Sequence, residues 1–298
     1  MAASTALAQP ASAKTVNGVP YRVLGKTGVE VSLLGVGGSH IGEDSLTDEQ
    51  AISLMRTAVD EGINFFDNAW EYKGGRSEER MGKALKSGYR EKVFLMTKTL
   101  TRDSKYAQQQ LEASLRRLDV DAIDLWQVHA IGNFPTDTKA VFERGVLEVA
   151  VKAREQGKIK YIGFTGHRDP AIHLAVLNGP FEWDTIQMPM NCFDVHNKSF
   201  VKDVAPAARD KGLGIIAMKT LASGAIPRSG SATPEEALRY AMSLPVSVVV
   251  SGMDSMEKLR ANLAVAKAFK PMSETEVAAL LDRTKAKASE KDAEWYKA

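Results

Sequence analysis

The chain has 298 residues, of which 44% are apolar and 26% are charged, which is the composition of an ordinary globular protein with a sizeable core. Its 39 basic and 37 acidic side chains leave a net charge of +2, and so balanced a charge argues against a nucleic-acid or membrane-surface protein, since either would need a concentrated basic face. No stretch approaches the roughly 18 consecutive apolar residues of a membrane span.

Residues 1–18 are expected to lie outside the folded domain. Residues 1–13 are small and weakly apolar, and Ala11-Ser12-Ala13 has the small-x-small form of a signal-peptidase site. A basic region ahead of this site is missing, so the segment predicts either a disordered tail or the remnant of a longer export leader. As written, the sequence favours the cytoplasm, and a truncated leader would instead place the protein in the periplasm.

Short apolar runs alternate with longer amphipathic stretches along the rest of the chain. Residues 21–29 predict a β-hairpin with Lys26-Thr27-Gly28 as its turn. Residues 31–36 predict a strand, and Thr47-Asp48-Glu49-Gln50 is the capping box of a helix that ends at Gly62. Seven further strands are expected, over residues 63–66, 93–97, 123–128, 161–164, 185–188, 214–218 and 246–250. Helices are expected between them, among others over residues 104–118 and 138–156.

The spacing of the strands decides the architecture. Strand starts recur at intervals of about thirty residues, the length of one βα unit, and eight strands that are almost continuously apolar suit a closed barrel. A doubly wound sheet would carry a glycine-rich phosphate turn after its first strand, and residues 35–42 lack the spacing of that fingerprint. We therefore predict an α/β fold with one domain over residues 19–298, a (β/α)8 TIM barrel with an N-terminal β-hairpin.

Four polar side chains follow or end neighbouring strands of this barrel. Asp67 directly follows the second strand and Tyr72 lies five residues later, while Lys98 follows the third strand and His129 ends the fourth. The intervals from Asp67 to Lys98 and from Lys98 to His129 are both 31 residues. The three side chains are therefore expected at a similar height at the C-terminal rim, where barrels of this kind hold their active sites.

Together these four groups can protonate an oxygen atom while hydride reaches the adjoining carbon. A tyrosine has an unperturbed pKa of about 10, and a neighbouring ammonium such as that of Lys98 is expected to lower it toward the working range. Asp67 would keep Lys98 charged and in place, and His129 would hydrogen-bond a carbonyl oxygen. Taken singly, each residue has an ordinary structural role, so the prediction rests on their common register.

Four segments carry a resemblance to a known family, namely residues 62–72 (GINFFDNAWEY), 97–99 (TKT), 124–129 (DLWQVH) and 157–163 (GKIKYIG). In their order and spacing, over residues 19–290, the chain resembles the aldo-keto reductase family. The resemblance implies that Tyr72 is the general acid, that Lys98 and Asp67 tune it, and that His129 orients the substrate. It also implies that a small carbonyl substrate, an aldehyde or ketone, is reduced to an alcohol by hydride from NADPH, bound extended across the barrel mouth.

The cofactor site implied by the resemblance departs from the family at several positions. Gln187 matches the family's carboxamide-binding glutamine, but Thr165-Gly166 replaces the usual Ser-Asn, and 218–221 (MKTL) replaces a stacking tyrosine followed by Ser-Pro-Leu. Gly252 stands where many NADP-binding members have a lysine. The residues assigned to the cofactor are Thr165, Gly166, Gln187, Met218, Lys219, Thr220, Leu221, Ser223, Gly252, Lys258 and Asn262.

The residues near 258 bear on the choice of cofactor. Lys258 matches a family arginine at the 2′-phosphate, and Asn262 matches an adenine contact. Cations beside the start of a helix suit a dianionic group, so NADP(H) is favoured, and NAD(H) stays an alternative.

Loops around the rim provide candidates for substrate contacts: Trp70, His40, His196 and Asn133. The chain after the last expected helix, residues 291–298, is short, which suggests an open mouth and broad substrate acceptance. A monomer and a small homo-oligomer are both compatible with the sequence.

Two other functions share the same residues. A cofactor-sensing regulatory subunit on the same fold would bind nicotinamide with little turnover, although the complete Asp-Tyr-Lys-His set argues against lost catalysis. A Schiff-base enzyme would use Lys98 as a nucleophile, which needs a depressed pKa that Asp67 disfavours. No metal is expected, because Cys192 is the single cysteine and excludes both an internal disulfide and a cysteine cluster.

Overall fold

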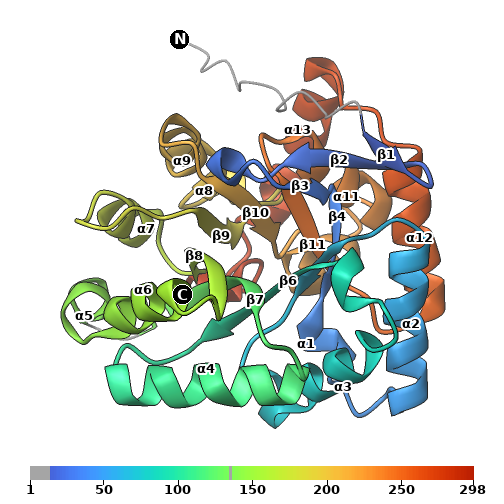
Figure 1. Cartoon of the computed structure of the whole chain (residues 1–298). Helices are drawn as coiled ribbons and strands as arrows, with labels where there is room; N and C mark the ends of the chain where they lie inside the picture. The colour runs from blue at the N-terminus through green and yellow to red at the C-terminus, as the bar shows by residue number, and fades with distance from the viewer. Residues whose placement is uncertain (1–13, 134–135) are drawn as a thin grey trace.

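The computed structural model describes residues 14–133 and 136–298, and at their centre eight parallel strands form a closed barrel (Figure 1). Each strand pairs with the next along the chain, and the last pairs with the first. The strands are β4 (Leu34–Gly37), β5 (Phe65–Asp67), β6 (Phe94–Thr99), β7 (Ile123–Ile131), β8 (Ile159–Gly166), β9 (Thr185–Pro189), β10 (Gly214–Met218) and β11 (Val248–Gly252). The (β/α)8 barrel predicted from the strand spacing is confirmed.

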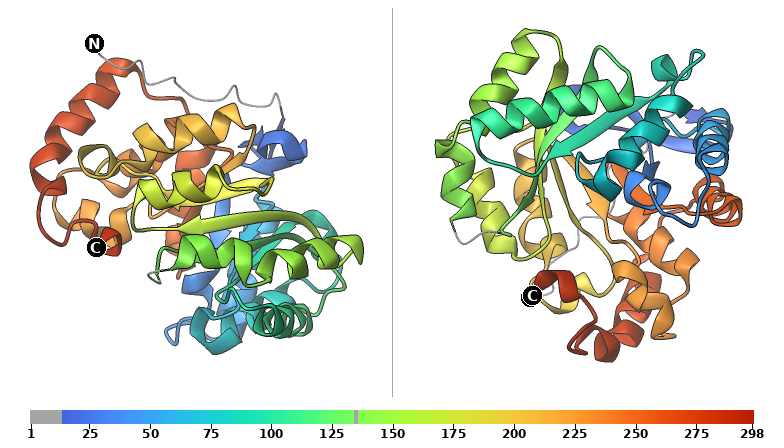
Figure 2. Two further views of the ribbon diagram at one scale, coloured as in Figure 1. Left: turned by 90° about the vertical axis from the view of Figure 1, so that its left-hand side faces the viewer. Right: turned by 90° about the horizontal axis from the view of Figure 1, so that it is seen from below.

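Helices cover the outside of the barrel in every view (Figures 1 and 2). They are α1 (Gly38–Ile41), α2 (Asp48–Asp60), α3 (Arg76–Ala84), α4 (Ser104–Leu118), α5 (Asp137–Glu143), α6 (Val146–Glu155), α7 (Pro170–Leu177), α8 (Phe200–Asp203), α9 (Ala205–Asp210), α10 (Ala225–Arg228), α11 (Pro234–Ser243), α12 (Met256–Lys267) and α13 (Glu274–Ala288). The capping box predicted for α2 is present, with Thr47 and Gln50 each accepting a backbone N–H of the other.

One predicted helix, over residues 138–156, is two helices in the structure. The break lies at Gly145, which has a φ of +85° and pairs through its backbone with Asp103. A left-handed residue ends an α-helix, and glycine adopts that conformation without steric penalty. The amphipathic pattern runs through the break and therefore hides it in the sequence.

A small antiparallel sheet precedes the barrel and closes its N-terminal end. It consists of β1 (Thr15–Val16), β2 (Val19–Val23) and β3 (Glu30–Ser32), so the predicted hairpin is confirmed and the strand expected over residues 31–36 divides between β3 and β4. Leu24 and Val31 pack in one apolar cluster with Phe65 and Phe94 of the barrel.

The tail expected over residues 1–18 is only partly described. Residues 1–13, with their candidate signal-peptidase site, lie outside the described residues. The described chain begins at Lys14, and Thr15–Val16 already pair with β2, so regular structure starts inside the segment that the sequence assigned to the tail.

The register of the barrel strands brings the predicted site residues to one face. Asp67 pairs with Met96 across β5 and β6, and Lys98 lies two residues beyond Met96. Lys98 in turn pairs with Gln127 of β7, and His129 lies two residues beyond it. Because side chains alternate along a strand, residues two apart share a face. The pairings therefore place the side chains of Asp67, Lys98 and His129 on the interior face of three successive strands, near the rim of the barrel.

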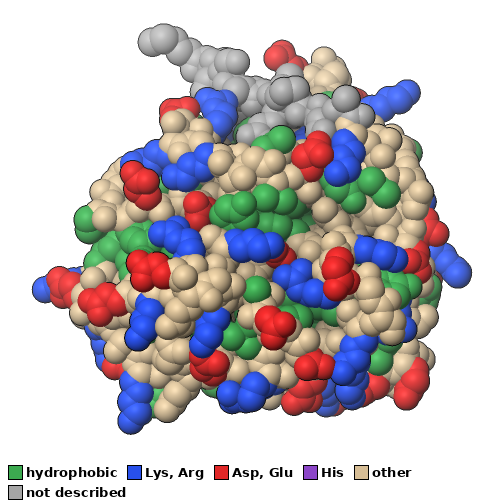
Figure 3. Space-filling model, viewed as in Figure 1, with side chains coloured by type: hydrophobic (Ala, Val, Ile, Leu, Met, Phe, Trp, Pro, Cys, Tyr) green, Lys and Arg blue, Asp and Glu red, His purple; other side chains and the backbone are tan. Residues whose placement is uncertain are grey.

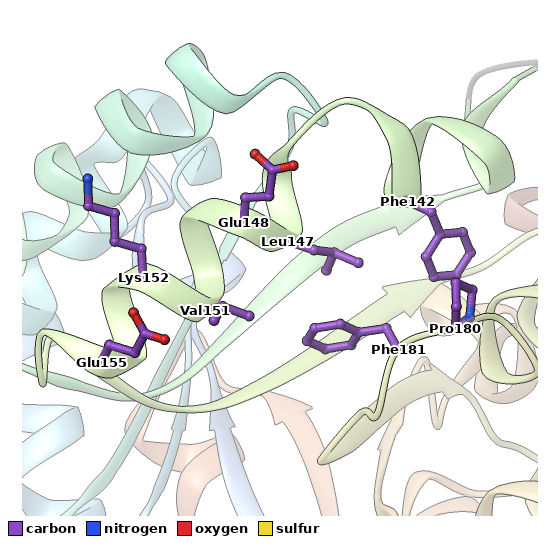
Figure 4. A pocket seen from close by; sticks show the side chains of 8 residues that line it. All are labelled: Phe142, Leu147, Glu148, Val151, Lys152, Glu155, Pro180 and Phe181. Carbon is purple, nitrogen blue, oxygen red and sulfur yellow. The ribbon is translucent and has the colours of Figure 1, made fainter.

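The surface carries no large field of one charge on the side seen in Figure 3, where acidic and basic side chains are interspersed. In the described part of the chain, no helix has the length and apolar character needed to cross a bilayer. An apolar groove lies on the outer flank of the barrel (Figure 4), and its lining is Phe142, Leu147, Glu148, Val151, Lys152, Glu155, Pro180 and Phe181. The groove contains none of the predicted site residues.

Candidate active site

Lys98 is the centre of a buried polar cluster at the C-terminal rim. Its side chain is 1% exposed, and its Nζ pairs with Oδ1 of Asp67. The same Nζ donates to the backbone oxygen of Asn68 at 2.6 Å and to the Tyr72 hydroxyl at 3.3 Å. Three acceptors thus satisfy the three N–H bonds of an ammonium. The structure brings together the aspartate, lysine and tyrosine that the sequence predicted.

The surroundings keep Lys98 charged and Tyr72 protonated. Burial works against the ammonium, but Asp67 and its neighbours outweigh this and raise the pKa of Lys98. Burial also raises the pKa of Tyr72 to about 12, and Lys98 only partly opposes this. The expected lowering of the Tyr72 pKa is therefore outweighed by desolvation. At neutral pH the phenol holds a proton that it can give.

His129 lies against Tyr72, with the two ring centroids 5.8 Å apart and the rings nearly perpendicular. Its Nδ1 is in close contact with Oε1 of Glu71, and its backbone oxygen accepts from Nη2 of Arg102 at 2.8 Å. Burial lowers the pKa of His129, and Glu71 opposes this. Glu71 is not among the residues predicted for the site, and its position next to Tyr72 is the one sequence signal that points to it.

The end of the site assigned to the nicotinamide carboxamide has an unused acceptor. Gln187 Nε2 donates to Oδ2 of Asp67 at 2.7 Å, while its Oε1 is buried and has no hydrogen-bond partner in the described structure. The Thr165 hydroxyl oxygen accepts from the backbone N–H of Ala130 at 3.1 Å, which leaves its own O–H free to donate elsewhere. These groups fit a carboxamide, which offers both N–H donors and an oxygen acceptor.

Packing explains why glycine follows Thr165. A Cβ built on Gly166 would lie 2.5 Å from the His173 ring and 2.6 Å from the backbone oxygen of Ile131. An asparagine has no room there unless its neighbours move. The replacement of the family's asparagine by Gly166 therefore goes together with close packing of His173 and Ile131 against this position.

The turn after β10 has an unusual backbone. Lys219, Ala222 and Ser223 have φ values of +55°, +47° and +54°, and Gly224 has +85°. Non-glycine residues in this region carry strain that tends to collect at ligand sites. The Lys219 backbone oxygen accepts from Asn191 Nδ2 at 3.1 Å, which holds the start of the turn. Met218, Lys219, Thr220, Leu221 and Ser223 thus lie on one tightly turned segment at the rim.

The end assigned to the adenosine phosphate gathers His40, Gly252 and Lys258. A Cβ on Gly252 would lie 2.2 Å from the His40 ring, so this ring occupies the space that a longer side chain would need. Lys258 Nζ pairs with Asp254 at 2.7 Å near the start of α12, and Asn262 Nδ2 donates to the Ser251 hydroxyl at 3.0 Å. His40, predicted as a substrate contact, therefore lies beside residues that the sequence predicts for the adenosine phosphate.

The other substrate candidates have protein partners of their own. Trp70 packs under Arg117, whose guanidinium carbon is 5.6 Å from the ring centroid. His196 Nε2 lies 3.5 Å from the Thr284 hydroxyl of α13, so it faces the outer layer rather than Tyr72. Asn133 is exposed and accepts from Arg168 at 3.4 Å.

The C-terminal segment reaches the rim although it is short. The Tyr296 ring centroid lies 6.4 Å from that of His167, which lies 6.3 Å from that of His129. Lys297 is buried and pairs with Asp194 at 2.7 Å and Glu294 at 2.8 Å. The open mouth expected from the length of this segment is thus narrowed on the side of β8 and β9. A buried ammonium between a carboxylate and a phenol at the rim of a barrel is an arrangement that can transfer a proton.

Comparison with known proteins gives the family. The model of the aldo/keto reductase family matches residues 33–236, which is more than half of the chain, and the protein therefore belongs to this family. The aldo-keto reductase YhdN of Bacillus subtilis is 33% identical over 229 residues, which cover 72% of this chain and 65% of that protein. The match thus spans slightly less than two thirds of this relative.

Solved structures show the same fold. The holo form of aldo-keto reductase AKR11C1 from Bacillus halodurans aligns with a TM-score of 0.73 at 23% identity, over 92% of this chain and 99% of that chain. An aldo-keto reductase of Klebsiella pneumoniae, solved in complex with NADPH, aligns with a TM-score of 0.73 at 24% identity, over 87% and 93%. At these identities the likeness concerns the fold.

Proposed function

We propose that the protein reduces aldehydes or ketones to alcohols with hydride from NADPH and a proton from Tyr72. The observation that carries the proposal is the buried contact chain from Asp67 through Lys98 to the Tyr72 hydroxyl. The Tyr72 hydroxyl, the last group in this series of contacts, lies at the rim of a parallel barrel, where a substrate can reach it. Membership of the aldo/keto reductase family supports the same reaction class.

The proton leaves a phenol that the site keeps neutral until the reaction. With the cofactor bound, the nicotinamide supplies hydride to the carbonyl carbon. Tyr72 gives its proton to the carbonyl oxygen and becomes a phenolate, and the neighbouring Lys98 ammonium stabilises that charge as it forms. The negative charge of Asp67 offsets the positive charge of Lys98 throughout the reaction. The net charge of these three residues therefore changes only when Tyr72 loses or regains its proton. A later proton from solvent restores the phenol.

The cofactor would be held by groups along one side of the rim. The free Oε1 of Gln187 and the Thr165 hydroxyl would bind the carboxamide, the strained turn from Lys219 to Ser223 would approach the pyrophosphate, and the start of α12 with Lys258 would bind the 2′-phosphate. NADP(H) is preferred over NAD(H) because Lys258 carries a charge that only a phosphate would use.

Lys98 argues against a Schiff-base reaction on the same barrel. A nucleophilic lysine must lose its proton near neutral pH, whereas Asp67 and the other partners raise the pKa of Lys98. Borohydride with a carbonyl compound should therefore leave Lys98 unmodified.

The test has two parts, because a cofactor-sensing protein would bind NADPH without turning it over. Intrinsic fluorescence should be titrated with NADPH and NADH side by side, with NADPH expected to bind more tightly. NADPH oxidation should then be followed with a panel of aromatic aldehydes for the wild type and for Tyr72→Phe. The wild type is expected to oxidise NADPH and the variant to lose nearly all of this activity. If NADPH binds but the wild type and Tyr72→Phe oxidise it equally, the cofactor-sensing function is supported instead. If neither nucleotide binds, both the reductase and the cofactor-sensing function are rejected.

A further inference from the structure

The contact between Glu71 and His129 joins two residues on different elements of the rim. Glu71 lies on the loop that follows β5, directly before Tyr72, and His129 lies in β7. Oε1 of Glu71 meets Nδ1 of His129, with the side chains 26% and 7% exposed. The second carboxylate oxygen, Oε2, and His129 Nδ1 are both buried and have no further hydrogen-bond partner in the described structure. His129 is therefore the close polar partner of this carboxylate.

The contact determines which ring nitrogen of His129 carries a proton. A carboxylate only accepts hydrogen bonds, so a bare Nδ1 facing it would set two acceptors against each other. Nδ1 must therefore hold a proton. In a neutral imidazole that leaves Nε2 bare, and a bare nitrogen cannot donate to a carbonyl oxygen. His129 can bind a carbonyl oxygen as a donor only when both nitrogens are protonated.

We propose that Glu71 is a positioning residue that fixes the proton on Nδ1 of His129 and supplies the negative charge with which Nε2 takes up a second proton to bind the substrate carbonyl. The proposal rests on the reductase function proposed above, and it leaves Tyr72 as the group whose proton is transferred. His129 Nε2 makes no hydrogen bond to the described residues and is not among their fully buried atoms, so a substrate oxygen can reach it.

The charged and titratable neighbours of His129 do not act in one direction. The groups that face its ring are Glu71 and Tyr72 after β5, Asp67 at the end of β5, Lys98 on β6 and His167 after β8. Arg102, which is paired with Asp137, contacts the backbone oxygen of His129 instead. Burial lowers the pKa of His129, Glu71 opposes this most strongly, Lys98 adds to the lowering and Asp67 opposes it weakly. Removing the charge of Glu71 therefore leaves burial and Lys98 with little opposition.

The pair would serve the two directions of the reaction differently. Reduction needs the doubly protonated ring, because the carbonyl oxygen is an acceptor. Oxidation of an alcohol needs an acceptor for the O–H group, and the neutral ring offers its bare Nε2. Reduction should therefore be favoured on the acid side of the His129 titration and oxidation on the alkaline side, with Glu71 setting the pH at which one form replaces the other.

Histidine-selective ¹⁵N NMR tests the proton positions without turnover. The protein has five histidines, and the signals of His129 are assigned by their loss in His129→Asn. In the wild type we expect Nδ1 to stay protonated while Nε2 titrates. In Glu71→Gln the midpoint should fall by about one pH unit or more, since an opposite charge at close range shifts a pKa by that amount. A wild-type ring with its proton on Nε2 and a bare Nδ1, or an unchanged midpoint in Glu71→Gln, would overturn the proposal.

Kinetics give the second measurement, with a matched control on the same side of the rim. Glu43 pairs with Lys73, the residue after Tyr72, at 2.8 Å, so Glu43→Gln removes a comparable ion pair without touching His129. Below pH 7, kcat/KM for carbonyl reduction should fall up to about tenfold in Glu71→Gln, as expected for a one-unit shift, and should not change in Glu43→Gln. The NADPH dissociation constant should be the same in all three proteins. A protein that never turns over refutes the reductase function, whereas an active protein whose pH profile ignores Glu71 refutes this inference alone.

Discussion

Strand β5 has three residues, and its first and last side chains share a face of the barrel but have different surroundings. Phe65 stacks on Phe94 with ring centroids 5.4 Å apart, in the apolar cluster that closes the N-terminal end. Asp67 pairs with Lys98 and accepts from Gln187 at the C-terminal rim. The exposed fraction is 0% for Phe65 and 4% for Asp67. Burial alone therefore does not separate a packing position from a chemical one.

The two positions differ in how specifically their neighbours restrict the side chain that can stand there. At the N-terminal end any side chain of the right size and apolarity satisfies the neighbours, because dispersion and desolvation have little directional preference. At the rim, each group is held by named donors and acceptors, and the loss of one leaves its partner buried and unpaired. Substitutions at the two ends should therefore separate stability from activity.

Lys98→Met should have the largest effect, because it disrupts both properties. Reductase activity should fall about 100- to 10,000-fold, the contribution usual for a tuned acid–base group. Asp67 would lose its cation, and stability should fall by about 3–5 kcal/mol, the usual result of removing one partner of a buried pair. Urea unfolding and steady-state NADPH oxidation measure the two effects.

The double variant Asp67→Asn/Lys98→Met is the control for this prediction. It removes both charges, so most of the lost stability should return while activity stays low. If the double variant were as unstable as the single one, an unpaired Asp67 could not be the cause of the instability.

Phe65→Ala tests the opposite end of the same strand. The loss of a buried phenylalanine removes its stacking on Phe94 and leaves a cavity, and stability should fall by about 3–5 kcal/mol. Activity per folded molecule should stay within about twofold, because Phe65 packs in the apolar cluster at the closed end and a packing defect there leaves the rim geometry intact. Urea unfolding and assays well below the unfolding midpoint measure these effects. A loss of kcat as large as that of Lys98→Met would show that the two ends are mechanically coupled.

The same contrast explains what could be predicted from the sequence. The barrel and the convergence of Asp67, Lys98 and His129 follow from regular strand spacing, since parallel strands carry side chains to the rim at a constant period. Glu71 could not be assigned, because it lies on a loop whose path decides which way its side chain points. The Tyr72 pKa was expected to move down and moves up, because desolvation depends on every neighbour rather than on Lys98 alone.

Gly166→Ala addresses a position at the rim where the His173 ring and the backbone oxygen of Ile131 leave no room for a side chain. The new methyl group would lie 2.5 Å from the His173 ring and 2.6 Å from the Ile131 oxygen, so one or both must shift. Overpacking of this kind usually costs about 1–3 kcal/mol, and thermal or urea unfolding measures it. Gly157→Ala is the control, because its Cβ would meet nothing within 4 Å and only its φ of +74° is strained. Backbone strain cannot explain a loss at Gly166, whose φ lies outside the left-handed region, so a Gly166→Ala variant as stable as the wild type would contradict the overpacking.

Lys258→Met should have the smallest effect and should leave stability unchanged. Its side chain is 60% exposed and pairs with the nearby Asp254, and surface substitutions of this kind usually stay within about 0.5 kcal/mol. The NADPH dissociation constant should rise about tenfold, because one charge-assisted contact to the 2′-phosphate is lost, and that for NADH should not change. Lys267→Met, at the far end of α12, removes a similar lysine paired with Glu61 and should alter neither constant. If the dissociation constants of NADPH and NADH rose together in Lys258→Met, Lys258 would contact a group that both dinucleotides have. The preference for NADPH would then have to come from another residue.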